Sequence, residues 1–177
     1  DYIYYIAHRP FVPIVKKASH KYFRTFANKA SAVTGASKKI EDYLKICGID
    51  KPVNIIPNAV EFDMFSEKNT NHERANEIKN IYGITEDITT FCFCGRLGKE
   101  KNIDTLFKYW SKTVKPEDKM KLLIFGDGPA HDELMQLSVE LGINNSVHFT
   151  GKIEHSELPP FYSVCNAYIT ASLSENY

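Results

Sequence analysis

The residues best suited to chemistry lie in segment 95–102, which follows the apolar run 89–94 and reads Gly-Arg-Leu-Gly-Lys-Glu-Lys-Asn. Gly95 permits a tight exit from a strand. Arg96 and Lys101 flank the expected start of the next helix, whose free N–H groups attract anions. A guanidinium, an ammonium and a helix N-terminus together suit a diphosphate. The alternative is a solvated basic loop, because Lys and Arg are common in loops.

Two further loops carry glycines after predicted strands. Gly126 and Gly128, in a Gly-Asp-Gly-Pro turn, would let a ligand approach the backbone closely. An ordinary strand-to-helix turn explains them as well. The turn 151–153, with Lys152 and Ile153, would line the pocket of a nucleotide base.

The last loop, 172–177, ends in the acidic and polar pair Glu175 and Asn176. A carboxylate just beyond a strand accepts hydrogen bonds from sugar hydroxyls, but an acidic first helical turn is an equal alternative. Other catalytic patterns are missing. A dinucleotide fingerprint would require glycine where His131 stands, and the sequence contains no GxxxxGK[ST], HExxH or GxSxG motif.

Alternating strands and helices must position these loops. From residue 89 the pattern predicts strands at 89–94, 121–125, 147–150 and 167–171, with helices near 102–114, 130–141 and 156–164. Upstream it predicts helices at 13–30, 37–47 (capped by Ser37 and ended by Gly48) and 72–82 (ended by Gly83), and short strands at 31–35 and 53–56. The alternation indicates an α/β fold, a Rossmann-like parallel sheet with helices on both faces. Such sheets bind ligands beyond the carboxyl ends of their strands.

The charges divide the chain. Lys and Arg total 22, as do Asp and Glu, so a uniformly basic surface for nucleic acid is not expected. Residues 1–60 hold ten basic and four acidic residues, and the remainder twelve and eighteen. With the turn-rich loop 57–71, this predicts two domains, 1–60 and 61–177. Ordinary surface variation is an even alternative for the charge pattern alone.

Composition limits the environment of the protein. The four cysteines lack the spacing of a zinc site and are interpreted as reduced core thiols, consistent with the cytosol. No run reaches the ~18 apolar residues of a membrane span. Since the sequence opens without Met and stops just after an apolar run, we expect a fragment.

The helix 13–30 is basic and amphipathic. It belongs to an aromatic-rich first segment, for which we favour a core position over an interfacial membrane face. The aromatic residues are Tyr2, Tyr4, Tyr5, Phe11, Tyr22, Phe23 and Phe26.

Taken in their order along the chain, the sequences of these loops resemble those of the retaining family 4 glycosyltransferases of GT-B fold. The resemblance runs from about residue 31 to the end. It rests on segments 56–60 with Phe65, 95–97 with 100–102, 124–129, 147–151 and 172–175. It implies two Rossmann-like domains facing a cleft, with residues 1–60 ending the acceptor-side domain and residues 61–177 forming the donor-binding domain.

The resemblance also implies roles for the residues. Arg96 and Lys101 would hold the diphosphate of a nucleotide sugar, Glu175 would contact the transferred sugar, and the turn 151–153 would lie against the base. No metal is expected, because the two cations and helix dipoles take over its electrostatic role. Departures from the family pattern include Ala59, Glu61 and the pair Asn176-Tyr177. The family's second glutamate would fall beyond residue 177, so we expect the fragment alone to be inactive.

The segment 1–6 resembles diacylglycerol glucosyltransferases. This implies UDP-glucose as donor, a lipid acceptor and a cytoplasmic enzyme of glycolipid biosynthesis. Through the basic segment 13–30 it would lie peripherally on the inner face of a bacterial plasma membrane. The alternatives are a capsular or exopolysaccharide glycosyltransferase, a nucleotide-sugar-binding module without turnover, and a structural domain with unoccupied loops.

Overall fold

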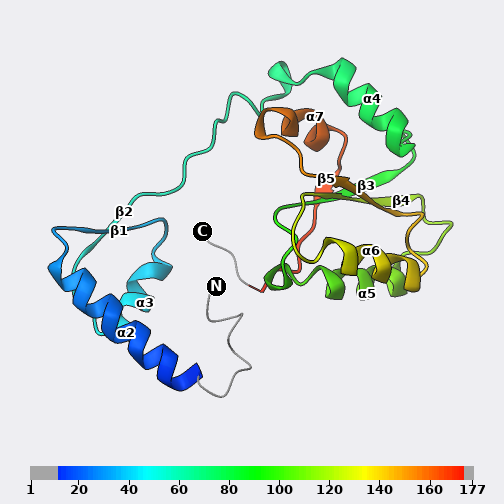
Figure 1. Ribbon diagram of the computed structural model, residues 1–177. Coiled ribbons are helices and arrows are strands. Elements are labelled where there is room, and N and C mark those ends of the chain that lie inside the picture. Colours follow the sequence, from blue (N-terminus) through cyan, green and yellow to red (C-terminus); the bar gives the residue numbers. More distant parts are fainter. Residues whose placement is uncertain (1–11, 174–177) are drawn as a thin grey trace. The chain divides into compact units, whose positions relative to one another are not determined.

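The computed structural model describes residues 12–173. Within them the chain forms two compact units, divided between Val60 and Glu61 (Figure 1). The units are described separately below.

The first unit is a small α/β arrangement. It consists of α2 (Val12–Lys29), β1 (Val33–Gly35), α3 (Lys39–Ile46) and β2 (Val53–Ile55), with β1 and β2 paired in parallel. Leu44, Cys47 and Ile49 form its buried core.

The end of α3 follows the prediction, but its start does not. Gly48 has a left-handed backbone (φ 73°), and its N–H donates to the Lys45 carbonyl at 2.9 Å, as expected of a helix-ending glycine. The predicted Ser37 cap is wrong, because the N-cap is Lys38, in a helical conformation and without a side-chain capping bond. Helix α3 therefore begins without the capping contribution of about 1 kcal/mol.

The aromatic side chains of α2 are exposed rather than buried. Tyr22, Phe23 and Phe26 are 68%, 47% and 66% exposed, so the predicted core position is wrong for them. Helix α2 contacts the rest of the unit through a different face. Ala27 packs against the core, and the His20 ring lies edge-on to Tyr43, with centroids 6.1 Å apart. Tyr2, Tyr4, Tyr5 and Phe11 lie outside the described residues.

The second unit contains the predicted parallel sheet. Its strands are β3 (Thr89–Cys94), β4 (Met120–Phe125), β5 (Val147–Gly151) and β6 (Ala167–Tyr168), in the order β5-β4-β3-β6, and every pairing is parallel. Strand β6 is shorter than the predicted 167–171, although Ile169 N–H still donates to the Cys92 carbonyl at 2.8 Å.

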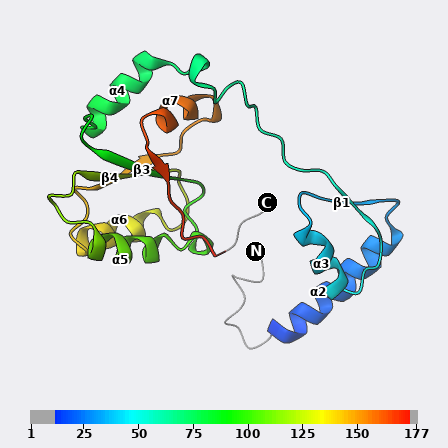
Figure 2. The ribbon, with the colours of Figure 1, turned by 180° about the vertical axis from the view of Figure 1, so that it is seen from behind.

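Helices cover both faces of this sheet, as predicted. Helices α5 (Ile103–Thr113) and α6 (His131–Glu140) lie on one face, and α4 (His72–Tyr82) and α7 (Leu158–Ser163) on the other (Figures 1 and 2). Short 3-10 turns precede α4, α5 and α7: η1 (Glu67–Asn69), η2 (Lys99–Lys101) and η3 (His155–Glu157).

Alternating side chains of the central strands fill two cores. Phe93, Leu122 and Phe107 pack between the sheet and the α5–α6 layer, whereas Cys92 and Leu123 pack on the α4–α7 side. Because side chains on both faces of the central strands are buried, apolar residues occupy consecutive positions at 91–94 and 122–125. Cys92 and Cys94 share one face, as predicted, and all four cysteines are free thiols.

The strand order determines where the loops meet. The chain leaves β3 and adds β4 and then β5 on one side, then returns to place β6 on the other side of β3. The order therefore reverses between β3 and β6, the position at which doubly wound sheets form their ligand crevice. No helix among the described residues is long and apolar enough to cross a membrane.

Candidate functional site

The loops after β3, β4 and β5 form a single pocket at the carboxyl edge of the sheet. The pocket has a volume of about 280 Å³ and includes five of the predicted site residues: Gly95, Arg96, Gly126, Lys152 and Ile153. Cys94, Phe125, Asp127 and Leu158 complete its lining. Segments separated by more than fifty positions in the sequence thus converge at the carboxyl edge of the sheet, on the β4–β5 side of β3.

Backbone hydrogen bonds join the three loops at the floor of this pocket. Gly95 N–H donates to the Phe125 carbonyl, and Gly126 N–H donates to the Gly151 carbonyl, each at 2.9 Å. The ladder of the sheet therefore continues one step beyond the strands. These bonds hold the backbone next to Arg96 and Lys152, which carry the side chains at the rim of the pocket.

A second set of bonds holds the β3 loop against the β4 loop. Leu97 is fully buried; its N–H donates to the Asp127 carbonyl and its carbonyl accepts from Ala130 N–H, both at 3.0 Å. Gly128 lies against this backbone, because a Cβ there would approach Leu97 atoms within 2.5–2.9 Å.

Close backbone packing gives a different reason for the two glycines than the one predicted. Gly126 has φ 136°, and a Cβ on it would overlap the Gly95 carbonyl. Both Gly126 and Gly128 are therefore required by loop-to-loop packing, whether or not a ligand also approaches them. Gly128 does not line the pocket.

The pocket carries mixed charge. Arg96, Lys152 and Asp127 are exposed at its rim. Lys152 pairs with Glu154 at 2.7 Å, and this hydrogen bond raises the pKa of the lysine, so its ammonium persists. The Asp127 carboxylate accepts from Gly128 N–H at 2.7 Å. Lys152 is thus paired with Glu154 and the Asp127 carboxylate is bonded to the backbone, so the Arg96 guanidinium is the rim group best placed to receive an anion.

The wall of the pocket below this rim is less polar. Burial raises the pKa of the Cys94 thiol, which is hydrogen-bonded to Tyr162. Burial and the same hydrogen bond also raise the pKa of the Tyr162 phenol. Cys94 is therefore a neutral thiol rather than a nucleophilic thiolate. With Phe125, Ile153 and Leu158 it gives the pocket an apolar side, suitable for the flat face of a base.

Lys101 does not line this pocket and lies instead near the loop that follows β6, whose described residues are 169–173 (the β6 loop). It is the last residue of η2, and its N–H donates to the Gly98 carbonyl at 3.0 Å. The residues on either side of it, Glu100 and Asn102, bond to the segment Ala171–Leu173. Arg96 and Lys101 thus mark two ends of the β3 loop, one facing the β4–β5 pocket and one beside β6.

Several functional candidates were not singled out from the sequence. Asp127 is visible in the Gly-Asp-Gly-Pro turn, but its place in the pocket depends on the packing of Gly128. Leu158 gives no sequence signal, since an apolar residue starting a helix is ordinary. Glu100, which is 7% exposed, also looks like a solvated loop residue. The predicted Glu175 and Asn176 lie outside the described residues.

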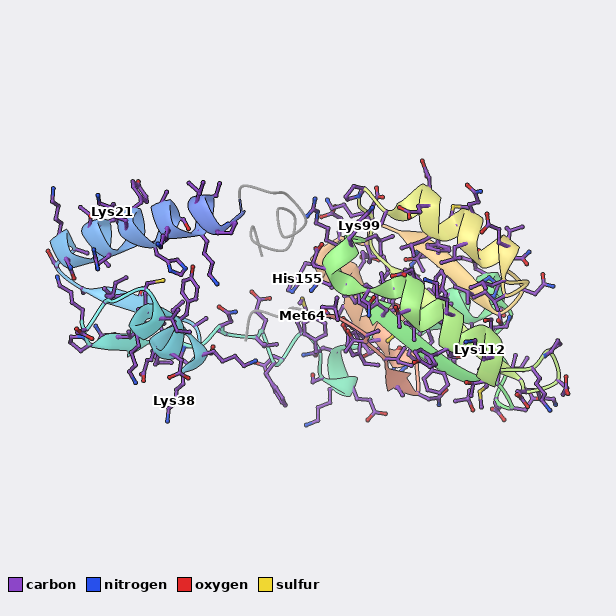
Figure 3. All side chains as sticks on the ribbon, turned by 90° about the horizontal axis from the view of Figure 1, so that it is seen from below. Lys21, Lys38, Met64, Lys99, Lys112 and His155 are labelled. Carbon is purple, nitrogen blue, oxygen red and sulfur yellow. The ribbon has the colours of Figure 1, made fainter. Side chains whose placement is uncertain are left out.

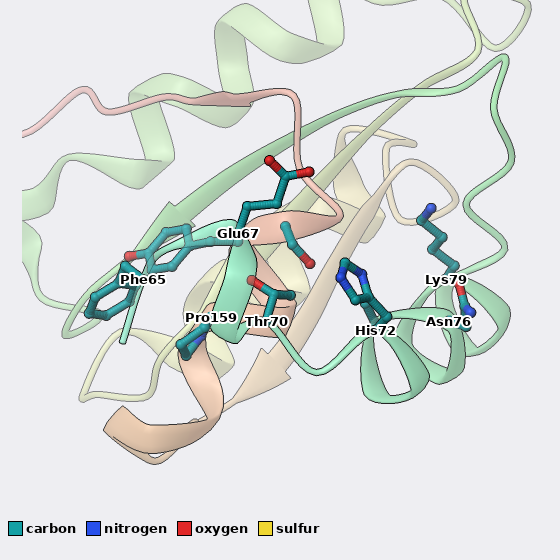
Figure 4. Close-up of a pocket in the computed structure, with 10 residues that line it drawn as sticks. Phe65, Glu67, Thr70, His72, Asn76, Lys79 and Pro159 are labelled. Atoms are coloured by element: carbon teal, nitrogen blue, oxygen red, sulfur yellow. The ribbon is translucent and has the colours of Figure 1, made fainter. Parts of the chain in front are cut away.

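A larger pocket of about 500 Å³ lies elsewhere, between the η1–α4 segment and α7. Figure 4 shows Phe65 and Pro159 at one end of it, His72, Asn76 and Lys79 at the other, and Glu67 and Thr70 between them. None of the predicted site residues lines it. Among residues 12–173, no group of three His, Cys, Asp or Glu side chains is arranged to hold a metal.

The fold is a doubly wound type of α/β domain, and its candidate site lies at the carboxyl ends of parallel strands, where such domains bind ligands. Residues 74–177 match the family of glycosyl transferases group 1. The chain belongs to this family, as the sequence motifs predicted.

Known relatives agree with this assignment. The alpha-monoglucosyldiacylglycerol synthase of Streptococcus pneumoniae is 31% identical over 176 residues, which cover 99% of this chain and 39% of that protein. The putative teichuronic acid biosynthesis glycosyltransferase TuaC of Bacillus subtilis is 26% identical over 164 residues, covering 92% of the chain and 38% of that protein. The chain therefore spans about two fifths of the length of these curated relatives.

The structural likeness confirms the predicted fold. Anabaena Alr3699/HepE, solved in complex with UDP-glucose, superposes with a TM-score of 0.76 at 18% sequence identity, covering 90% of this chain and 43% of that protein. The predicted α/β architecture of a GT-B glycosyltransferase is thus correct.

Proposed function

We propose that the protein containing this chain transfers glucose from UDP-glucose to a membrane lipid such as diacylglycerol, with retention of the anomeric configuration. The observation that carries the donor part is the convergence of three strand-end loops on one pocket with Arg96 and Lys152 at its rim. The similarity to the Streptococcus pneumoniae synthase supports the lipid acceptor.

Within this proposal each loop has one task. Arg96 and Lys101 hold the diphosphate and stabilise the charge that develops on it as the sugar leaves. Lys152 and Ile153 lie against the base, and Glu175, with Asn176, contacts the sugar hydroxyls. No metal is required, because the two cations supply the positive charge, and their effect strengthens as water leaves a closing site.

The same proposal assigns a different substrate to each domain. Residues 1–60 belong to the acceptor-side domain and its linker, and residues 61–177 to the donor-binding domain. The separation into two compact units between Val60 and Glu61 supports this assignment. Because the chain spans about two fifths of its curated relatives, turnover is to be tested on the full-length protein.

The donor is tested by calorimetric titration of UDP, UDP-glucose and GDP into the full-length protein. We expect both uridine compounds to bind and GDP to bind more weakly. Incubation with UDP-glucose and vesicles containing diacylglycerol should yield monoglucosyldiacylglycerol. If UDP and UDP-glucose do not bind, the donor proposal fails. Binding without turnover on any acceptor would favour a nucleotide-sugar-binding module instead.

We also propose that α2 contacts the inner face of the bacterial plasma membrane, which would make the protein cytoplasmic and peripheral. Tyr22 and Phe26 are exposed and stack with ring centroids 6.3 Å apart, and basic residues such as Lys21 lie nearby in the helix. An apolar face with flanking cations binds anionic lipid surfaces.

The membrane contact predicts an effect of Tyr22→Ser combined with Phe26→Ser. In sedimentation with phosphatidylglycerol vesicles, the double variant should bind about 10-fold more weakly, since two aromatic side chains leave the interface. The control, Met135→Ser with Val139→Ser, removes exposed apolar residues from α6 instead. Equal retention of the two variants on the vesicles would refute the contact through α2.

A second candidate is a glycosyltransferase of capsular or exopolysaccharide synthesis. The similarity to the Bacillus subtilis protein TuaC favours it. The two candidates share the donor site and differ in the acceptor. Turnover on a polysaccharide precursor, without turnover on diacylglycerol, would select the second.

A further inference from the structure

Asn102 stands out by its backbone. It is the single non-glycine residue with positive φ among residues 12–173, at φ 54°. A left-handed conformation costs an ordinary L-residue roughly 1–2 kcal/mol, and glycine adopts it freely. Glycine would adopt this conformation without strain, so the presence of asparagine points to a function of its side-chain amide.

The amide of Asn102 joins two loops that are distant in sequence. Its Nδ2 donates to the carbonyl of Ala171 at 3.2 Å, and its Oδ1 accepts from Thr105 Oγ1 at 2.9 Å. The side chain makes no capping bond to the backbone of α5. Of the two bonds, only the one that Nδ2 donates reaches across to the β6 loop.

Neighbouring backbone groups make the same connection. The Glu100 carbonyl accepts from Leu173 N–H at 2.9 Å and from Ser172 Oγ at 3.3 Å. Strand β6 itself pairs with β3 only through Ala167 and Tyr168. Residues 171–173, beyond β6, are thus held by hydrogen bonds to Glu100 and Asn102 rather than by pairing with the sheet.

We propose that Asn102 is a positioning residue, which sets the β6 loop relative to the loop that carries Arg96 and Lys101. This inference rests on the proposed function and deepens it. The sheet order reverses between β3 and β6, so these two loops must hold the diphosphate and the sugar of one donor at a fixed separation. A displacement of one loop would leave diphosphate binding intact and misplace the reacting sugar.

Two variants of the full-length protein test the bridge. Asn102→Gly keeps the left-handed backbone accessible and deletes the amide. Asn102→Asp keeps an acceptor for Thr105 but places a carboxylate oxygen opposite the Ala171 carbonyl. For both we expect kcat for glucosyl transfer to fall about 10- to 100-fold, as for other small misplacements of reacting groups, while the Kd for UDP changes by no more than about twofold.

Thr105→Val serves as the matched control, because it removes one hydrogen bond of Asn102 and leaves the bond to Ala171. We expect its kcat to stay within about threefold of the wild type. If Asn102→Gly retains wild-type kcat, the inference is overturned. It is also overturned if the Asn102 variants lose UDP and UDP-glucose affinity equally together with a lower Tm, because that result indicates a structural role. Absence of UDP binding to the wild type would instead refute the proposed function.

Discussion

Replacing Arg96 and Lys101 together by alanine should abolish measurable UDP binding to the full-length protein. Each cation is proposed to contact the diphosphate, and hydrogen bonds to charged groups contribute roughly 1.5–3 kcal/mol each. Loss of both therefore predicts a weakening of at least about 100-fold. Calorimetric titration of UDP and UDP-glucose into the wild type and the double variant measures it directly.

The single variants Arg96→Ala and Lys101→Ala should differ in their effects on UDP binding and on kcat. Arg96 lines the pocket formed with the β4 and β5 loops, whereas Lys101 lies in η2 beside the residues bonded to the β6 loop. We therefore expect Arg96→Ala to weaken UDP and UDP-glucose alike. Lys101→Ala should lower kcat more than it weakens UDP binding, because Lys101 lies between the two residues that bond to the segment Ala171–Leu173.

A charge-matched control is available in the same region. Lys99 and Lys112 are exposed on the η2–α5 side of the domain (Figure 3), and neither lines the pocket. The double variant Lys99→Ala, Lys112→Ala removes the same net charge. It should bind UDP within about twofold of the wild type, because long-range attraction is screened at physiological salt. Equal losses in the two double variants would show that general charge, rather than the β3 loop, attracts the nucleotide.

The sheet was predictable because its signals are local. Three of its strands are short segments rich in apolar residues, each followed by or ending in a glycine (Gly95, Gly126 or Gly151), and the helices between them show clear periodicity. Those signals place every loop at the carboxyl edge once the sheet is known to be parallel. The pocket followed from this reasoning without any knowledge of the strand order.

The errors arise where the outcome depends on distant partners. The aromatic residues of α2 show an amphipathic pattern, but the pattern does not say which surface covers them. Ser37 is a good N-cap by type, yet the helix begins after Lys38. The short β6 pairs with β3 across 76 positions, and Asn102 bonds to Ala171 across 69, so no local spacing reveals either contact.

A side chain at Gly126, in the loop after β4, should destabilise the protein. Gly126→Ala places a Cβ against the Gly95 carbonyl and forces alanine into positive φ. Backbone strain of this kind costs of order 1–3 kcal/mol, and the steric overlap adds to it. We expect the free energy of unfolding of the full-length protein to fall by about 3 kcal/mol or more, as measured by urea denaturation.

Gly142→Ala is the matched control, because it introduces the backbone strain of positive φ without the steric overlap of a Cβ. Gly142 also has positive φ, at 67°, but no atom lies within 4 Å of the position of its Cβ, so its substitution should cost only about 1 kcal/mol. The two variants would lose equal stability if conformational freedom alone selected glycine at Gly126. A larger loss at Gly126 means that the β3 and β4 loops are packed backbone to backbone. The Arg96 loop then owes its position to a glycine thirty residues away, and UDP affinity should fall with Gly126→Ala but not with Gly142→Ala.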